Sequence, residues 1–321
     1  MAFLNSNLVA QLAQMFLVVL VAPLVTGVVR KVKARLLRRR GASVLQPYYD
    51  LWKLMRKETV PAPNASWLYH AAPYALFALT WVAAALVPTF ATGLGFNWAA
   101  DLIVIVGLLA AARFALALAG MDIGTGFGGL GASREMMISS FAEPAMLMVM
   151  FALALEAGTT QLSSIAGYLI AHPAALHISL ALALVSYIIV LLAENARIPV
   201  DNPSTHLELT MVHEAMVLEY SGRHLAMIEA AAFLKLVLYM SIFSCLFVPF
   251  GMVTSDRTVA TMAAGAALYV GKLLLGAAAL AVGETSVAKM RVFRVGEFLG
   301  VGLVLGLLAL LLHFVAAAGV N

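Results

Sequence analysis

The sequence predicts an all-α polytopic membrane protein with about eight transmembrane helices. Three observations carry this prediction: the chain has 63% hydrophobic residues, only 11% charged residues and a mean hydropathy of +0.97. Soluble domains contain roughly 25% charged residues. No fixed-period repeat, low-complexity tract or soluble segment interrupts the apolar pattern, so residues 1–321 are expected to form a single membrane domain.

Eight apolar runs approach the ~20 residues that a helix needs to cross the hydrocarbon core. They lie at about residues 8–29, 72–91, 99–119, 138–157, 176–193, 226–249, 259–282 and 296–318. The connections on one side of the membrane are long, and amphipathic helices are expected in them. These connections cover about residues 30–71, 120–137, 194–225 and 283–296.

Basic residues predict the orientation, because cytoplasmic loops carry an excess of Lys and Arg. If the connection at 30–71 is cytoplasmic, sixteen of the twenty Lys and Arg residues lie inside and Arg257 alone lies outside. The remaining three, Arg113, Lys235 and Lys272, fall within spans. Both termini are therefore expected on the outer, periplasmic side. This distribution accounts for the net charge of +4 without a nucleic-acid partner.

The first long connection holds a run of arginines followed by an amphipathic segment. The arginines that stand out are Arg35, Arg38, Arg39 and Arg40. Apolar and aromatic residues then recur at helical spacing over residues 46–54, which predicts a helix on the membrane surface. Its polar residues are Gln46, Asp50 and Lys53. These residues either dock a partner or, for the arginines, only satisfy the rule for membrane insertion.

The second connection is rich in glycine from Gly124 to Gly131. Glycines can cradle a phosphate, but no strand precedes this run and no Gly-Lys-Ser/Thr sequence follows it. Packing of flexible backbone near a helix start is the better interpretation. Arg134 and Glu135 follow directly and can form an ion pair at the membrane boundary.

The third connection begins with polar residues at the end of an apolar run. Glu194 and Arg197 are three residues apart, so on a helix they share a face and can neutralise each other before Pro199 ends the helix. Asp201 follows, and charged residues then alternate with apolar ones, which predicts a helix with one apolar face. Such an ordered connection is expected to be a docking surface or a cavity wall.

Several ionisable residues lie inside spans or at their ends, where charge is costly and usually functional. The acids expected to line a polar path from the third connection into the membrane are Glu143, Glu194, Glu208 and Glu219. Glu229 and Lys235 belong to the sixth span, and Lys235 with a facing glutamate can form a charge pair that gates transfer. The competing interpretation is that these ion pairs only hold helices in register.

Glu284 and Glu297 flank the last connection. Acids at helix ends often just face water, so these two are weaker candidates for ion transfer than Glu143 and Glu194.

The chain carries no ligand set of its own for a redox centre. Its one cysteine, Cys245, lies in an apolar span, so neither a disulfide nor an iron–sulfur cluster can form within the chain. The seven histidines are scattered without metal-ligand spacing, and no metal site is expected.

Five short motifs occur in order along nearly the whole chain. They are Ala34-Arg35 with Arg38-Arg39-Arg40-Gly41, Gln46-Pro47-Tyr48 with Asp50 and Lys53-Leu54, Glu194-x-x-Arg197-x-Pro199-x-Asp201, Glu208-Leu209, and Tyr220-Ser221-Gly222. Each is weak alone. In combination they resemble the H-type core membrane subunit that respiratory complex I shares with membrane-bound nickel–iron hydrogenases.

Departures from the complex I pattern favour the hydrogenase branch. Complex I members usually carry Glu-Ala-Glu-Ser-Glu-Leu where this chain has Ser-Thr-His-Leu-Glu-Leu at 204–209, so two of the three glutamates are absent. Ala232 stands where those subunits tend to place a glutamate, and Lys235 follows it. These features resemble hydrogenase 4 component C and its formate hydrogenlyase relatives.

The resemblance implies a membrane anchor and coupling subunit of a group 4, energy-converting nickel–iron hydrogenase in a bacterial or archaeal cytoplasmic (inner) membrane. Its expected partners are a hydrogenase-like large subunit, a small Fe–S subunit, antiporter-like membrane subunits and lipids. The partners would hold the nickel–iron site and the Fe–S clusters, and intramembrane carboxylates would carry protons or sodium ions.

Two alternatives follow from the same sequence. The first is the H-type subunit of respiratory complex I, in which the chain would line a quinone chamber. The second is a stand-alone ion transporter, which is disfavoured because the sequence shows neither an inverted repeat nor paired broken helices.

Overall fold

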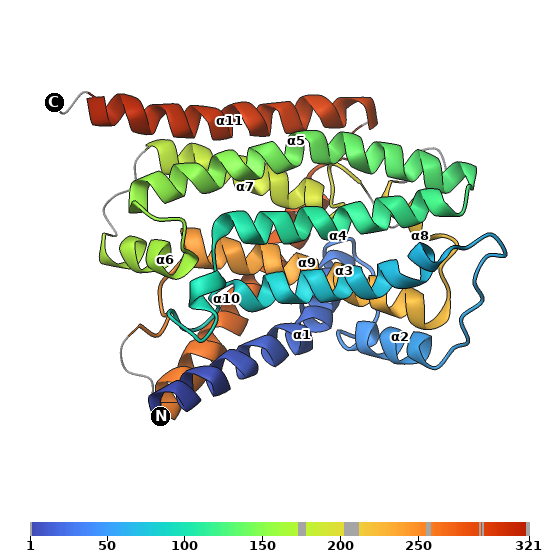
Figure 1. The fold of residues 1–321 in the computed structure, drawn as a ribbon, viewed down its shortest axis with the longest axis horizontal. Coiled ribbons are helices and arrows are strands. Elements are labelled where there is room, and N and C mark those ends of the chain that lie inside the picture. The colour runs from blue at the N-terminus through green and yellow to red at the C-terminus, as the bar shows by residue number, and fades with distance from the viewer. Residues whose placement is uncertain are drawn as a thin grey trace.

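The computed structural model describes residues 2–172, 178–201, 212–254, 258–288, 290 and 292–318. These residues form a helical bundle that lacks β-strands in the described ranges (Figure 1). The helices are α1 (Ala2–Leu36), α2 (Gln46–Met55), α3 (Trp67–Leu86), α4 (Leu102–Asp122), α5 (Gly126–Ala157), α6 (Leu162–Ala171), α7 (Ile178–Glu194), α8 (His213–Val217), α9 (Gly222–Phe247), α10 (Val259–Ser286) and α11 (Val292–Ala318), with a 3₁₀ turn at Asn97–Ala99.

The helices confirm the all-α polytopic fold. Seven of them are long and apolar enough to cross a membrane, namely α1, α3, α4, α5, α9, α10 and α11. The eighth predicted span corresponds to α7, whose 17 described residues fall just short of the length that the other seven reach. Each of the eight apolar runs in the sequence therefore coincides with a helix.

The predicted boundary of the second connection is wrong. The sequence placed a loop at 120–137, but α4 continues to Asp122 and α5 already begins at Gly126. Thr125 starts α5, because its hydroxyl accepts a hydrogen bond of 3.2 Å from the Gly128 amide. Arg134 and Glu135 consequently lie on a helix rather than in a loop.

Helix α9 forms the centre of the bundle, and α10 and α11 form its rim. In its most apolar window, 72% of the α9 residues are buried, against 28% in α10 and 22% in α11. Helix α11 packs on α5 and α7, while α1 packs on α9 and α10 (Figure 1). The exposed sides of α10 and α11 are apolar, as expected for helices that face lipid or another membrane subunit.

The start of α1 and the end of α11 lie at one end of the bundle, and α2 and α8 lie at the other (Figure 1). Because both chain ends lie at the same end of the bundle, the arrangement agrees with a chain that crosses the membrane an even number of times. The assignment of the α2 and α8 end to the cytoplasm remains a prediction from the basic residues.

The glycine-rich segment packs helices together, as the sequence suggested. A Cβ on Gly128 would lie 2.1 Å from the Gly120 carbonyl oxygen, so α4 and α5 approach closely only because residue 128 has no side chain. A Cβ on Gly131 would lie 2.9 Å from the Val212 carbonyl oxygen and 2.9 Å from Ala215 Cβ. The missing side chain of Gly131 thus leaves room for α8, which belongs to the third connection.

The Tyr220-Ser221-Gly222 motif fastens the first connection to the bundle. Tyr220 stacks on Tyr69 with ring centroids 4.0 Å apart and donates a hydrogen bond of 3.0 Å to the Tyr69 carbonyl oxygen. Burial raises the pKa of Tyr220 above its ordinary value, so the phenol remains a donor. The Ser221 hydroxyl pairs with both backbone groups of Val60, at 2.9 and 3.1 Å. Gly222 has a φ of +53°, which favours glycine.

Candidate functional site in a buried charge cluster

Four helices bring charged side chains to one place inside the bundle. Arg113 of α4 is the centre, with only 5% of its surface exposed. Its Nε lies 3.5 Å from Glu135 Oε1, and its Nη1 lies 3.1 Å from Glu143 Oε1. Both glutamates belong to α5, two helical turns apart on the same face. Arg113 Nη2 also contacts the carboxylate of Glu194 at the end of α7.

Lys235 of α9 completes this cluster from the other side. Its Nζ lies 3.0 Å from Glu194 Oε2, so Glu194 lies between two cations. Glu194 is 6% exposed. We call the five residues Arg113, Glu135, Glu143, Glu194 and Lys235 the central cluster.

The charges of the central cluster do not balance when all five groups are ionised. Three carboxylates face two cations, which leaves one excess negative charge. Burying an isolated charge is costly, and pairing offsets that cost only when each charge keeps a partner. An excess carboxylate in such a place is the group that a proton or another cation would neutralise.

Glu143 lies at the open edge of the central cluster. Its side chain is 34% exposed, whereas those of Arg113 and Glu194 are 4% and 2% exposed. A small cavity adjoins Glu143, Arg113 and Glu194 and is also lined by Tyr239. The centre of a water molecule could move within about 10 Å³ of it. That volume is close to what a single water molecule needs. The cluster therefore has space for water on the side of Glu143.

A second buried ion pair network lies where α1, α10 and the third connection meet. Glu284 of α10 is 4% exposed. Its carboxylate lies 3.0 Å from Lys33 Nζ and 3.4 Å from Arg197 Nη1. Burial lowers the pKa of Arg197 despite the opposing effect of Glu284, but the guanidinium remains charged at any physiological pH.

A third group of charges joins α1, α2 and α9. Arg30 Nη1 lies 4.0 Å from Asp50 Oδ2, and its guanidinium lies over the Phe233 ring at 5.7 Å. Asp50 accepts a hydrogen bond of 2.8 Å from the Gln46 amide. Glu229 of α9 lies near Arg30 and Asp50. The Arg30–Asp50 contact thus links α1 to α2, and the Asp50 side chain stays 46% exposed.

The predicted pairing of Glu194 with Arg197 is wrong. The helix ends at Glu194, and Ala196 follows with a φ of +47°, so the two residues do not share a helix face. Arg197 instead reaches Glu284 on α10, and Glu194 reaches two other helices. The third residue of the motif, Pro199, accepts a hydrogen bond of 2.9 Å from the Met290 amide. Asp201 is buried.

The expected ion pair of Arg134 with Glu135 is also wrong, because Glu135 turns toward Arg113. Adjacent residues on a helix point in different directions, and α5 extends through both. Of the expected polar path, Glu143 and Glu194 meet at Arg113, whereas the side chain of Glu219 is exposed. Glu208 lies outside the described residues.

Three residues of these networks were not foreseen as partners from the sequence. Arg113 was seen only as a charge inside an apolar run, where charge is rare, and that rarity was the signal that could have marked it. Glu284 was expected to face water, but it is buried, and Lys33 continues α1 beyond the predicted boundary.

The predicted docking residues divide into two groups. Gln46 and Asp50 are partly exposed and bond to each other within α2. The basic residues are exposed at the end of the bundle that carries α2, and they are Arg35, Arg38, Arg39, Arg40 and Lys53.

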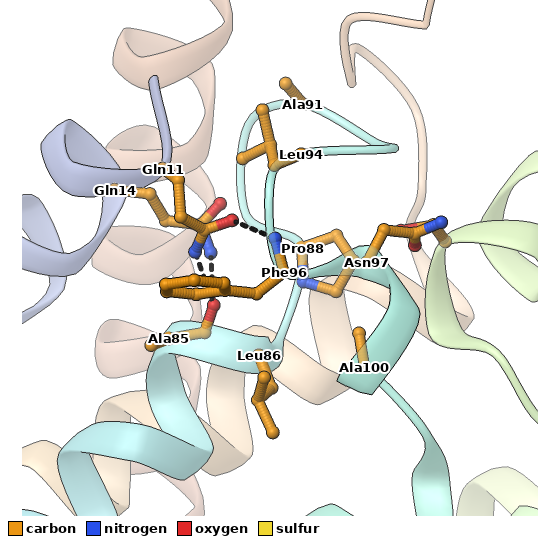
Figure 2. Close-up of a pocket in the computed structure, with 11 residues that line it drawn as sticks. Gln11, Gln14, Ala85, Leu86, Pro88, Ala91, Leu94, Phe96, Asn97 and Ala100 are labelled. Carbon is orange, nitrogen blue, oxygen red and sulfur yellow. Dashed lines mark hydrogen bonds between the residues drawn. The ribbon is translucent and has the colours of Figure 1, made fainter. Parts of the chain in front are cut away.

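A separate polar pocket lies where the start of α1 meets the end of α3. Figure 2 shows the amides of Gln11 and Gln14 directed at the Ala85 carbonyl, to which both donate, at 2.7 and 3.2 Å. Gln14 also donates to the Val87 carbonyl at 2.8 Å. These bonds satisfy carbonyls that the end of a helix leaves unpaired. We assign this pocket a structural role.

Comparisons with known proteins identify the family. The model of the NADH dehydrogenase family matches residues 9–316. The chain belongs to this family. It is 32% identical over 298 residues to hydrogenase-4 component C of Escherichia coli, which covers 93% of each protein. It is 31% identical over 280 residues to formate hydrogenlyase subunit 4 of the same organism, which covers 87% of this chain and 90% of that protein.

More distant relatives include a complex I protein and a solved structure. The H-type subunit of the NADH-quinone oxidoreductase of Anaplasma phagocytophilum is 28% identical over 68% of this chain and 69% of its own length. The fold matches a chain in the structure of the membrane-bound sulfane sulfur reductase, an archaeal respiratory membrane complex, with a TM-score of 0.78 and 19% identity over 95% of this chain and 99% of that one. This likeness confirms the fold. Within the described residues, no group of three or more His, Cys, Asp or Glu side chains has an arrangement that could hold a metal ion.

Proposed function

We propose that this chain is the membrane anchor and coupling subunit of a complex I-like, energy-converting nickel–iron hydrogenase. Its similarity to hydrogenase-4 component C and formate hydrogenlyase subunit 4 over about nine-tenths of the chain supports the class of complex. The central cluster is the observation that carries the coupling role, because five ionisable residues gather inside a membrane bundle. Such residues are expensive in a membrane and are usually retained for a function.

The charged side chains of the central cluster can exchange partners while ion pairs still join the helices that carry them. Arg113 is shared among three carboxylates, and Glu194 is shared between two cations. Protonation of Glu143 removes the excess negative charge and frees part of the Arg113 guanidinium for Glu194 and Glu135. The contact of Lys235 with Glu194 then weakens, because Glu194 is held more firmly by Arg113. A proton that binds Glu143 on α5 in this way changes the ion pair that Lys235 of α9 makes.

The exposed basic residues are the proposed docking surface for a peripheral arm. Four exposed arginines lie between positions 35 and 40, and no acid lies among them. The hydrogenase-like large subunit and the small Fe–S subunit would bind here and carry the redox centres. Complementary charge would steer their docking. Antiporter-like subunits would pack on the apolar membrane faces of the bundle.

Purification of the tagged chain from its native membranes tests this proposal. The expected result is a complex with a large subunit containing two Cys-x-x-Cys pairs, with nickel and iron at stoichiometric amounts. Recovery of the chain alone, or as an oligomer of itself, would instead support the ion transporter.

The alternative is a chain that lines a quinone chamber, as in complex I. The similarity to the H-type subunit of NADH-quinone oxidoreductase is the observation that keeps this alternative open. A quinone-site inhibitor, titrated against the activity of the purified complex, separates the two functions. The hydrogenase proposal predicts no inhibition at concentrations that saturate a quinone site.

A further inference from the structure

Tyr239 of α9 lines the small cavity that adjoins Glu143, Arg113 and Glu194. Only 2% of the surface of Tyr239 is exposed, so its hydroxyl depends on partners inside the bundle. The remaining lining residues are apolar, and they are Val106, Leu109, Ala110 and Met146. The polar groups that meet at this cavity are therefore the tyrosine and three charged residues of the central cluster.

Contacts with α7 hold Tyr239 in place. Its backbone carbonyl accepts a hydrogen bond of 2.7 Å from the hydroxyl of Tyr187, and the centroids of the two rings lie 6.4 Å apart. Its own hydroxyl is hydrogen-bonded to Glu194 at the end of the same helix. A phenol can donate one hydrogen bond and accept another. With the Glu194 carboxylate as acceptor, the Tyr239 oxygen can still accept a hydrogen bond from the cavity.

The cavity has room for a single water molecule. A buried water typically makes about three hydrogen bonds. The carboxylates of Glu143 and Glu194 and the hydroxyl of Tyr239 supply three partners around the cavity. The Glu143 side chain is 34% exposed, so it can take up a proton from outside the cluster, whereas Glu194 at 2% cannot.

We propose that a water molecule in this cavity and the Tyr239 hydroxyl together carry a proton from Glu143 to Glu194. This inference rests on the proposed coupling function. The O–H bond of protonated Glu143 breaks as its proton binds the water oxygen, and another proton of that water moves to the Tyr239 oxygen. The original O–H bond of Tyr239 breaks as its proton forms an O–H bond on Glu194. Water and phenol end as neutral as they began, and the proton has moved from α5 to α7.

This transfer changes which carboxylate balances the cations. Glu143 becomes a carboxylate again and pairs with Arg113. Neutral Glu194 no longer balances Lys235, so the contact that protonation of Glu143 had already weakened is lost. Tyr239 thus controls the step at which Lys235 of α9 is released.

The test uses the intact complex in inside-out membrane vesicles, with hydrogen turnover driven by a viologen dye. Tyr239→Phe keeps the ring and removes only the hydroxyl. It is expected to lower the rate of proton translocation per hydrogen turned over by about 10²-fold, the lower range for a proton-transfer group. Tyr269→Phe is the matched control and should translocate normally. Tyr269 is also buried and shares a hydrogen bond of 2.6 Å with Ser241 of α9, but it does not line the cavity.

A second variant tests the water without changing an ionisable group. Ala110 lines the cavity, and the two methyl groups that Ala110→Val adds fill space that the water needs. The same loss of about 10²-fold is expected. Normal translocation in either Ala110→Val or Tyr239→Phe would overturn the proposal.

A solvent isotope measurement separates proton transfer from a packing role. When the relay is impaired, proton transfer limits translocation, so deuterium oxide should slow both variants more than it slows the wild type. All rates are normalised to the amount of assembled complex, so a variant that assembles poorly is still measured. Slow translocation with the wild-type ratio of rates in the two solvents would overturn the proposal in favour of packing.

A parallel Glu194→Gln variant distinguishes this inference from the proposed function. Loss of coupling in Glu194→Gln with normal coupling in Tyr239→Phe would overturn the role of Tyr239 alone. Normal coupling in both variants would overturn the coupling function itself.

Discussion

At the scale of single residues, Arg113 organises the candidate site. Three carboxylates depend on its guanidinium, which is 4% exposed. No sequence motif marks it, because its partners lie 22, 30 and 81 residues away and meet it only through helix packing. Glu194, by contrast, was expected to be functional from its position at the end of an apolar run, although its partners were not foreseen.

Replacing Arg113 by Ala is expected to destabilise the protein strongly. Removal of one partner from a buried ion network typically costs about 3–5 kcal/mol, because the remaining charges stay buried and unbalanced. Thermal unfolding of the detergent-solubilised complex measures the effect. Arg39→Ala, at an exposed arginine, is the control and should leave the unfolding temperature unchanged. Equal stability of the two variants would show that Arg113 does not balance the cluster.

The burial of His213, the first residue of α8, leads us to predict that the stability of the protein depends on pH. Its folded-state pKa is lowered by burial, so the unfolded chain binds more protons than the folded one below the ordinary histidine pKa of about 6.5. Stability contributed by this group is therefore present above that pH and is lost as the pH falls toward and below the folded-state pKa. Thermal unfolding measured across this range should show a smaller loss in His213→Gln than in the wild type. An identical pH dependence in the two proteins would contradict this assignment.

At the scale of elements, glycines decide how α4, α5 and α8 meet. The long apolar runs made the spans predictable, since a run of ~20 apolar residues has few other uses. The ends of α4 and α5 were not predictable, because the glycine run reads as a loop by composition but continues as helix. Because Gly128 and Gly131 have no side chains, α4 and α8 pack directly against the backbone of α5.

Two neighbouring glycines provide a direct test of this packing. Gly128→Ala places a Cβ 2.1 Å from the Gly120 carbonyl oxygen, so α4 and α5 must separate. The expected loss of stability is about 1–3 kcal/mol, typical of overpacking. Gly129→Ala meets nothing within 4 Å and should leave stability unchanged or raise it by up to about 1 kcal/mol. The free energy of unfolding in detergent gives both values, and a neutral Gly128→Ala would show that the close approach is not required.

At the scale of the whole molecule, the bundle has two different ends. The start of α1 and the end of α11 share one end, and α2, α8 and the basic residues of the first connection share the other (Figure 1). Arg30 and Lys33 of the basic segment belong to two of the charge groups, and the central cluster lies between α4, α5, α7 and α9. The predicted topology rests on counting basic residues, whereas the networks emerged only from the packing of helices distant in sequence.

Charge reversal tests the docking surface. The triple variant Arg38→Glu, Arg39→Glu and Arg40→Glu is expected to release the peripheral subunits from washed membranes, because the surface would repel the acidic partner face that it normally attracts. Immunodetection of the subunits in membrane and soluble fractions measures the release. Retention of the arm by this variant, even at high salt, would show that the arginines serve membrane insertion only.

The most direct measurement is the number of protons translocated per hydrogen molecule in vesicles that contain Glu194→Gln complex. Glu194 joins Arg113 to Lys235, so we predict that translocation is lost while hydrogen turnover with an artificial dye continues. Glu58→Gln, at an exposed glutamate, should translocate normally. A wild-type ratio of protons to hydrogen in fully assembled Glu194→Gln complex would contradict the coupling role of the central cluster.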